Sequence, residues 1–146
     1  MNDPPAFVFF NEIGIIGHLA RTAAERVLPA GLSMAGFEVL NHMVRLGHVD
    51  RPPARIASAM QVTRGAITGT LKRLAAEGWI VVDPDPHDGR AKTVNITPAG
   101  RETRTAALAA LAPLFDDLFR GIEMAEVGAI LPTLRRVRML LDAARD

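Results

Sequence analysis

The sequence predicts a mainly α-helical protein with one small β-hairpin. Apolar residues recur at three-to-four spacing over most of the 146 residues, which is typical of amphipathic helices. After Gly78 the period changes, and two short β-branched runs, WIVVD and KTVNIT, flank the turn-rich segment PDPHDGRA. Hydrophobic residues make up 49% of the chain, enough to fold without metal or disulfide support.

Four helices are expected before the hairpin. The first spans about residues 5–27, and LPAGLS breaks it. Ser33 is a good N-cap for a second helix that Gly47 ends. A linker, HVDRPP, leads to a third short helix over residues 54–60. Thr63 caps the fourth helix, which ends at Gly78 and whose expected buried stripe consists of Ile67, Leu71 and Leu74.

Two long helices follow the hairpin. Thr97-Pro98 places a cap and a first-turn proline at the start of a helix that runs to about residue 122. The last helix spans about residues 124–144, and Pro113 and Pro132 predict a kink in each. The central order predicts a winged helix-turn-helix lobe over residues 31–104. Residues 1–30 and 105–146 are expected to form an all-α dimerisation lobe across a two-fold axis, because they carry more apolar surface than one small lobe can cover.

Composition narrows the functional classes. Cysteine and tyrosine are absent, and no nucleophile, phosphate-loop or dinucleotide motif is present, so we expect no enzyme activity and no cofactor. The N-terminal run AFVFFNEIGIIGHLA is interrupted by Asn11, Glu12 and His18 and is too short to span a membrane. Since Asp3 also precedes it, we expect a buried amphipathic helix rather than a signal peptide. A cysteine-free chain fits a cytoplasmic protein.

Positive charge is concentrated in the middle of the chain. Residues 51–104 hold nine basic and five acidic side chains, although the overall formal charge is only +1. This distribution indicates a surface that faces a polyanion, and an ordinary solvated surface is the alternative.

Three segments resemble the MarR family of bacterial transcription regulators. DPDPHDGRAKTVNITPAGRE (residues 83–102) resembles the family's wing, and RIASAMQVTRGAITGTLKRLAAEGWI (55–80) resembles its helix-turn-recognition helix. LSMAGFEVL (32–40) is similar to the start of the second helix. The resemblance implies a homodimer that binds a pseudo-palindromic operator in double-stranded DNA. It also implies a repressor, often autoregulating, that releases DNA when a small phenolic, aromatic or lipophilic effector binds between the lobes.

Two departures from the family pattern bear on DNA binding. The strand after Gly78 often carries arginines in the family, and here Val81, Val82 and Asp83 stand there. The recognition-helix position of Gly69 often bears a long polar side chain. These departures keep a second hypothesis open, a winged-helix dimer that acts as a protein-interaction module without specific DNA binding.

The fourth helix is the expected reader of DNA bases. Its face opposite the buried stripe is centred on Gly65, Gly69 and Lys72. Such a face can enter the major groove, where Thr68 would hydrogen bond to a base and the Ala66 methyl would contact thymine. A solvated face of an ordinary amphipathic helix is the alternative. The predicted DNA-binding residues are Thr63, Arg64, Gly65, Ala66, Thr68, Gly69, Lys72, Arg73, Asp88, Arg90 and Lys92.

Arg90 at the hairpin tip is expected to enter the minor groove. Asp88 is expected to hold the loop or pair with an arginine, with positioning of Arg90 as one option. Lys92 would contact phosphate. A plain exposed turn is the alternative.

The four histidines do not predict a metal site. His18, His42, His48 and His87 lie on different elements without ligand spacing. His18 and His42, with Arg21 one turn after His18, are candidates for lining an effector pocket, in which Arg21 would pair with an acidic ligand.

Overall fold

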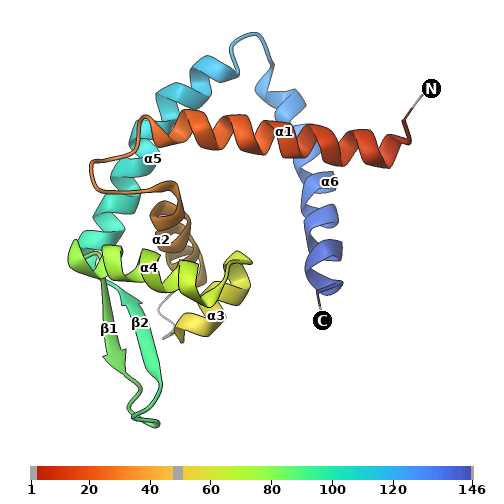
Figure 1. The fold of residues 1–146 in the computed structure, drawn as a ribbon. Helices are drawn as coiled ribbons and strands as arrows, with labels where there is room; N and C mark the ends of the chain where they lie inside the picture. The colour runs from red at the N-terminus through yellow and green to blue at the C-terminus, as the bar shows by residue number, and fades with distance from the viewer. Residues whose placement is uncertain (1–2, 48–50, 146) are drawn as a thin grey trace. The chain divides into compact units, whose positions relative to one another are not determined.

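The computed structural model describes residues 3–47 and 51–145, and within them it has the element order that the sequence predicts (Figure 1). Four helices, a hairpin and two further helices follow one another, and the only sheet of the described residues is two-stranded and antiparallel. The elements are α1 (Pro5–Glu25), α2 (Met34–Leu46), α3 (Pro53–Met60), α4 (Arg64–Ala76), β1 (Ile80–Pro84), β2 (Lys92–Ile96), α5 (Pro98–Leu118) and α6 (Met124–Ala143).

Three helices begin at the caps that the sequence predicts. In each, a side-chain oxygen accepts a hydrogen bond from the backbone N–H three residues later and so satisfies a donor that has no partner within the helix. The pairs are Ser33 with Gly36 at 3.1 Å, Thr63 with Ala66 at 3.1 Å and Thr97 with Gly100 at 3.0 Å.

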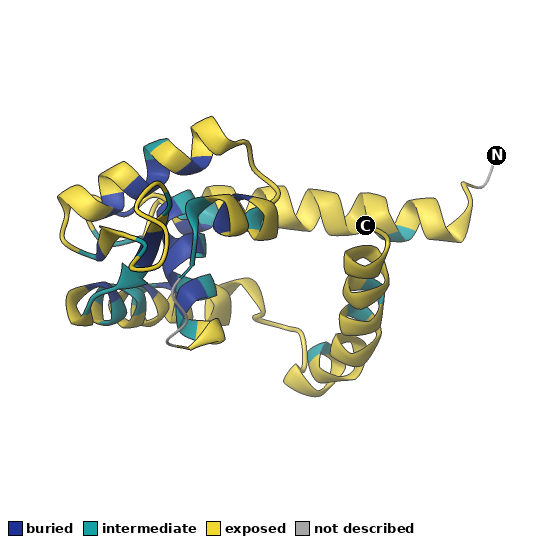
Figure 2. Cartoon of the chain, turned by 90° about the horizontal axis from the view of Figure 1, so that it is seen from below, coloured by how far each residue is buried: buried dark blue, intermediate teal, exposed yellow. Residues whose placement is uncertain are grey.

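The hydrophobic core is built by α2, α3, α4 and the hairpin, with Ala107 and Leu111 of α5, and Figure 2 shows the buried residues gathered in one part of the chain. Leu40, Ile56 and Val94 come from three of these elements and are fully buried. The predicted stripe of α4 is buried as well. Met60, the last residue of α3, is half-buried. The core therefore fixes α4 by one face and leaves its other face uncovered.

The hairpin forms an antiparallel pair in which Ile80 lies opposite Ile96 and Pro84 opposite Lys92. Arg51 adds a third short segment at the base, because its carbonyl accepts a hydrogen bond from the backbone N–H of Val94 at 2.8 Å. Burial does not alternate along β1, because Ile80 is buried whereas Val81 and Val82 are both exposed. The hairpin is thus anchored at its base and open to solvent toward its tip.

The chain divides into two compact units, Met1–Ala112 and Pro113–Asp146. The helix α5 begins in the first unit and continues past Pro113 into the second, and α6 continues past Pro132. The expectation that α1 is buried is wrong for the single chain, since Ala24 is its one buried residue. The division into winged-helix and dimerisation lobes stays a prediction. No helix in residues 3–47 and 51–145 has the length and apolarity that crossing a membrane requires.

Candidate nucleic-acid interface

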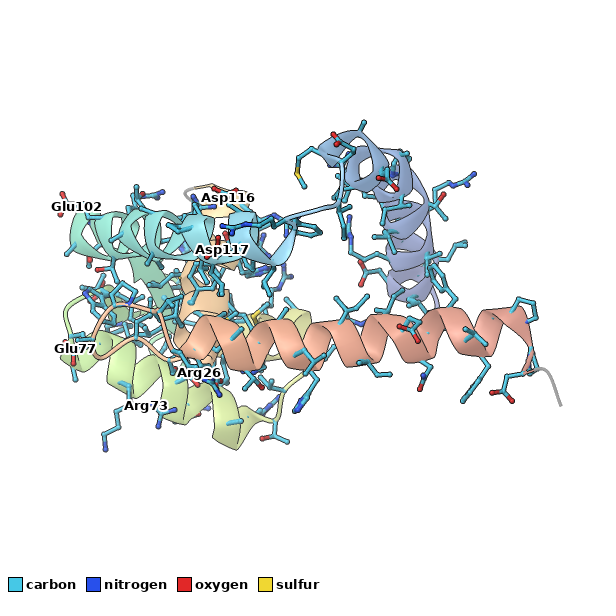
Figure 3. The ribbon with its side chains drawn as sticks, turned by 90° about the horizontal axis from the view of Figure 1, so that it is seen from above. Arg26, Arg73, Glu77, Glu102, Asp116 and Asp117 are labelled. Carbon is cyan, nitrogen blue, oxygen red and sulfur yellow. The ribbon has the colours of Figure 1, made fainter. Side chains whose placement is uncertain are left out.

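The outer face of α4 carries the residues that the sequence predicts to meet DNA. Ile67, Leu71 and Leu74 point into the core, so the opposite side of the helix is turned to solvent. Arg73 lies on this outer side (Figure 3). Among the described residues, no carboxylate forms an ion pair with Arg64, Lys72 or Arg73. These three cations are therefore available to a polyanion.

Two threonine hydroxyls on this face differ in the hydrogen bond that each already makes, one as acceptor and one as donor. The Thr63 oxygen accepts the cap hydrogen bond from Ala66, so its hydroxyl hydrogen is free to donate. The Thr68 hydroxyl donates to the carbonyl of Arg64 at 2.7 Å, so its lone pairs are free to accept. A donor at the helix N-terminus suits a phosphate oxygen. An acceptor in the middle of the face suits the amino group of adenine or cytosine in the major groove.

The two glycines of α4 leave its backbone bare on the outer face. A Cβ added at Gly69 would meet nothing nearer than the Arg73 guanidinium, at 3.9 Å, and one added at Gly65 would meet Thr63 Oγ1 at 4.0 Å. Neither glycine is required by packing inside the chain. The Arg73 guanidinium lies beside the empty position.

The tip of the hairpin is held by its own carboxylates. Asp85 Oδ1 accepts hydrogen bonds from the backbone N–H groups of His87 at 2.8 Å and Asp88 at 3.3 Å. Asp88 Oδ1 accepts from the backbone N–H of Arg90 at 3.0 Å. Asp88 thus fixes the backbone of Arg90, one of the roles expected for it, and no described residue forms an ion pair with the Arg90 side chain. Lys92 is exposed at the start of β2.

The sequence did not predict that Arg51 pairs with the hairpin. Its backbone pairs with Val94 on the edge of β2 that faces away from β1, and its charge lies close enough to His42 on α2 to affect the pKa of that histidine. Arg51 Nε is buried without a hydrogen-bond partner in the described chain. The double proline after Arg51 was the available signal, because a residue before proline favours extended backbone.

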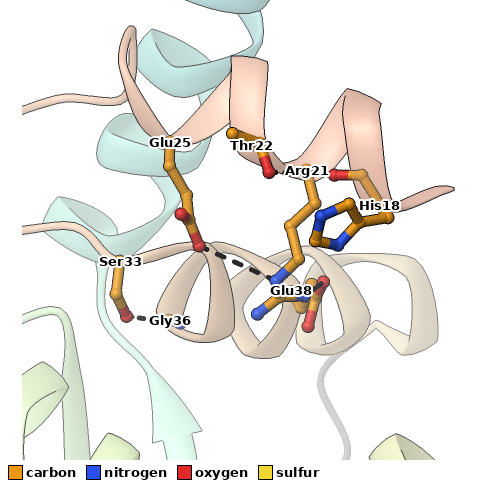
Figure 4. Close-up of polar contacts among 7 residues, drawn as sticks. All are labelled: His18, Arg21, Thr22, Glu25, Ser33, Gly36 and Glu38. Carbon is orange, nitrogen blue, oxygen red and sulfur yellow. Dashed lines mark hydrogen bonds and ion pairs between the residues drawn. The ribbon is translucent and has the colours of Figure 1, made fainter. Parts of the chain in front are cut away.

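The predicted pocket residues lie on two helices, His18 and Arg21 on α1 and His42 on α2. Arg21 lies between two carboxylates, Glu25 at 3.7 Å on its own helix and Glu38 on α2 (Figure 4). Its guanidinium is therefore already paired, which weakens the expectation that it binds an acidic ligand. His18 lines an open hollow of about 450 Å³ along α1 with Phe10, Asn11, Gly14, Ile15 and Leu19.

His42 lies on α2 in a different setting. Partial burial lowers its pKa below the usual value, and the nearby charges of Arg51 and Arg45 lower it further. His48 lies outside the described residues. The described part of the chain holds no group of three His, Asp or Glu side chains placed to bind a metal ion.

Comparison with known proteins defines the family of this chain. Residues 30–91 match the model of the MarR family. Over 99 residues the chain is 32% identical to the multiple antibiotic resistance protein MarR of Salmonella typhimurium, a match that covers 62% of this chain and 67% of that protein. The chain belongs to the MarR family. It is also 38% identical over 72 residues to YdgG of Bacillus subtilis, named an uncharacterized HTH-type transcriptional regulator, and spans 47% of that relative.

Solved structures of MarR-family regulators share the fold over nearly the whole chain. Sco5413 of Streptomyces coelicolor matches with a TM-score of 0.77 and 25% identity, covering 97% of this chain and 98% of that one. A MarR variant from E. coli in complex with operator DNA matches with a TM-score of 0.71 and 23% identity, covering 87% and 91%. The predicted fold class is thereby confirmed, and the sequence match places the chain in a family of transcriptional regulators.

Proposed function

We propose that this MarR-family regulator is a homodimer that binds a pseudo-palindromic operator specifically. The observation that carries the proposal is the pairing of an uncovered recognition-helix face with a wing tip whose Arg90 backbone is fixed and whose side chain has no partner in the described chain. Two α4 helices would enter successive major grooves about one helical turn, roughly 10 bp, apart. The E. coli relative was solved in complex with operator DNA, which supports the same mode of binding.

The residues divide by expected role. Thr63 and Lys72 would contact phosphates, which position the protein without reading sequence. Thr68 would read a base amino group, Ala66 a thymine methyl, and Arg64 and Arg73 guanine or phosphate. Arg90 would enter the flanking minor groove, with Lys92 on a phosphate and Asp88 holding the loop.

Dimerisation is supported by the terminal helices. Exposed apolar side chains include Phe7, Ile16 and Leu19 on α1 and Met139 and Leu140 on α6, each at least 58% exposed in the single chain. Exposed apolar side chains in this number usually meet a partner. The hollow beside His18 has only α1 as a wall, so an aromatic or lipophilic effector would need a second wall from the partner chain. Effector-dependent release of DNA, and hence repression, belongs to the proposal.

A fluorescence anisotropy titration tests the function. The probes are the DNA upstream of the protein's own gene and a shuffled duplex of the same composition, both at physiological salt. Specific binding predicts an affinity ratio of at least about 10³. Equal affinity for the two duplexes would reject specific DNA binding and favour the protein-interaction alternative. A library of aromatic acids, screened by thermal shift and then by DNA release, tests the effector.

A further inference from the structure

One threonine links the recognition helix, the wing and α5. The Trp79 N–H donates to the carbonyl of Leu74 in the last turns of α4 at 3.0 Å, which ties the start of the wing to that helix. Thr97 Oγ1 donates to the carbonyl of Gly78 at 2.7 Å, and the Thr97 N–H donates to the carbonyl of Trp79 at 3.0 Å. The same Oγ1 accepts from the N–H of Gly100 at 3.0 Å. Three elements therefore meet at the Gly78–Trp79 peptide.

Gly100 allows this close approach. A Cβ at position 100 would lie 2.0 Å from the carbonyl oxygen of Trp79 and 2.9 Å from Ile96 Cγ1. The first contact is with backbone, which cannot rotate away as a side chain can. By contrast, Gly69 has open space around it. The first turn of α5 can pack on the start of β1 only while residue 100 lacks a side chain.

We propose that Thr97 and Gly100 form a clip that sets the position of the wing relative to α4, which makes them positioning residues for DNA binding. The proposal rests on the proposed function, because α4 and the wing must reach the same duplex. A five-residue strand at about 3.3 Å per residue is a lever of about 17 Å, so a tilt of about 10° at its base moves the tip by about 3 Å. That displacement is the length of a hydrogen bond and would carry Arg90 out of place.

Four variants test the clip. Thr97→Val removes the hydroxyl, Thr97→Ser restores it, and Gly100→Ala introduces the blocked Cβ. Thr105→Val is the matched control, since the Thr105 hydroxyl donates only within α5, to the carbonyl of Arg101 at 3.0 Å. Each variant is studied below its melting temperature, where circular dichroism shows that it is folded.

The DNA experiment combines operator affinity, salt dependence and hydroxyl-radical footprinting. For Thr97→Val and Gly100→Ala we expect at least about tenfold weaker binding, a salt slope smaller by about one, and loss of backbone protection at the outer flanks, where the wing lies, while protection at the half-site centres remains. Thr97→Ser should recover wild-type values, and Thr105→Val should not change them. An affinity loss with an unchanged footprint and slope would mean a merely structural role and would overturn the proposal.

The free protein gives a second readout, because Trp79 is the single tryptophan of the chain. Its emission should shift and its quenching by acrylamide should increase in Thr97→Val and Gly100→Ala, but not in Thr105→Val. Unchanged Trp79 fluorescence in both clip variants would overturn the clip even if the wild type bound no DNA. Loss of specific binding by the wild type would instead reject the proposed function. If Gly100→Ala fails to fold, the Thr97→Val and Thr97→Ser pair decides.

Discussion

The winged-helix part and the terminal helices of this chain differ in how far their apolar residues are buried. In the first, Leu40 and Val94 are completely buried, whereas in the second Leu19 is 62% and Leu140 71% exposed. Residues 1–30 and 105–146 are richer in apolar residues than residues 31–104, with 41 of 72 against 30 of 74, so apolar content alone does not decide which residues are buried. What differs is whether the single chain supplies a surface to cover the apolar face.

The contrast separates two kinds of exposed surface. The uncovered face of α4 is basic, polar and rich in backbone, which suits a hydrated polyanion. The uncovered faces of α1 and α6 are apolar, which suits a second protein surface. A homodimer bound to DNA satisfies both, and substitutions on each surface should therefore fail in different assays.

The largest effect is expected from the closed core. Leu40→Ala should lower the free energy of unfolding by about 2–5 kcal/mol, because it removes buried methyl groups and leaves a cavity. Urea denaturation at fixed protein concentration measures the loss. Light scattering should show the same oligomer as the wild type wherever the variant is folded. A change below about 0.5 kcal/mol would contradict the burial of Leu40.

The next effect concerns the open apolar face. Ile16→Glu places a charge among the exposed apolar side chains of α1, where Ile16 is 62% exposed in the single chain, and should convert the proposed dimer to monomer at micromolar concentration. Ile16→Leu, which keeps an apolar side chain at the same position, is the matched control. Sedimentation velocity distinguishes the species. An Ile16→Glu protein that stays dimeric would remove α1 from the interface.

The wing should affect DNA binding without affecting assembly. Arg90→Ala should weaken operator binding and reduce the salt slope by about one, because one phosphate counterion is no longer displaced. Arg26→Ala is the control, as it removes an exposed charge just after α1. Identical slopes for wild type and Arg90→Ala would exclude the wing tip from the interface.

The bare backbone of α4 gives a smaller effect. Gly69→Ala should stabilise the free protein by up to about 1 kcal/mol, because the new methyl group fits in open space within a helix. Gly65→Ala makes the same test at the other glycine of this face. If operator affinity falls despite the added stability, the helix approaches the bases too closely for a side chain at that position. Retained affinity would assign base reading to Arg64, Arg73 and the wing.

The smallest effect is a dependence of stability on pH. The pKa of His42 is lowered in the folded protein, so the unfolded chain binds a proton more readily. Stability is therefore full above the ordinary histidine pKa of about 6.5 and declines as the pH falls from there toward the lowered value. His42→Gln should reduce this decline, measured by thermal melts from pH 7.5 to 5, and His87→Gln on the exposed wing should not. An equal decline in both variants would contradict the assignment.

The sequence predicted the features that depend on local pattern. The buried stripe of α4, the capping oxygens of Ser33, Thr63 and Thr97, and the hairpin around the wing tip follow from periodicity and turn chemistry. Three features could not be predicted from the sequence, because they depend on residues distant in the chain. The pairing of Arg51 with Val94 is one, and the contact of Arg21 with Glu38 is another.

The third is steric. Nothing in the sequence near Gly100 shows that a carbonyl from Trp79 occupies the space of its missing side chain. The expected burial of α1 failed for a related reason, since its amphipathic pattern indicates that one face will be covered but not by which chain. The predicted DNA-binding and effector residues stay predictions until a ligand is bound.

Hydroxyl-radical footprinting of the upstream DNA with the wild-type protein tests the central claim most directly. A dimer that reads DNA with α4 and grips it with the wing should protect two half-sites with centres about one helical turn, roughly 10 bp, apart, with minor-groove protection on both outer flanks. Diffuse protection that disappears when competitor DNA is added would contradict specific recognition by this interface.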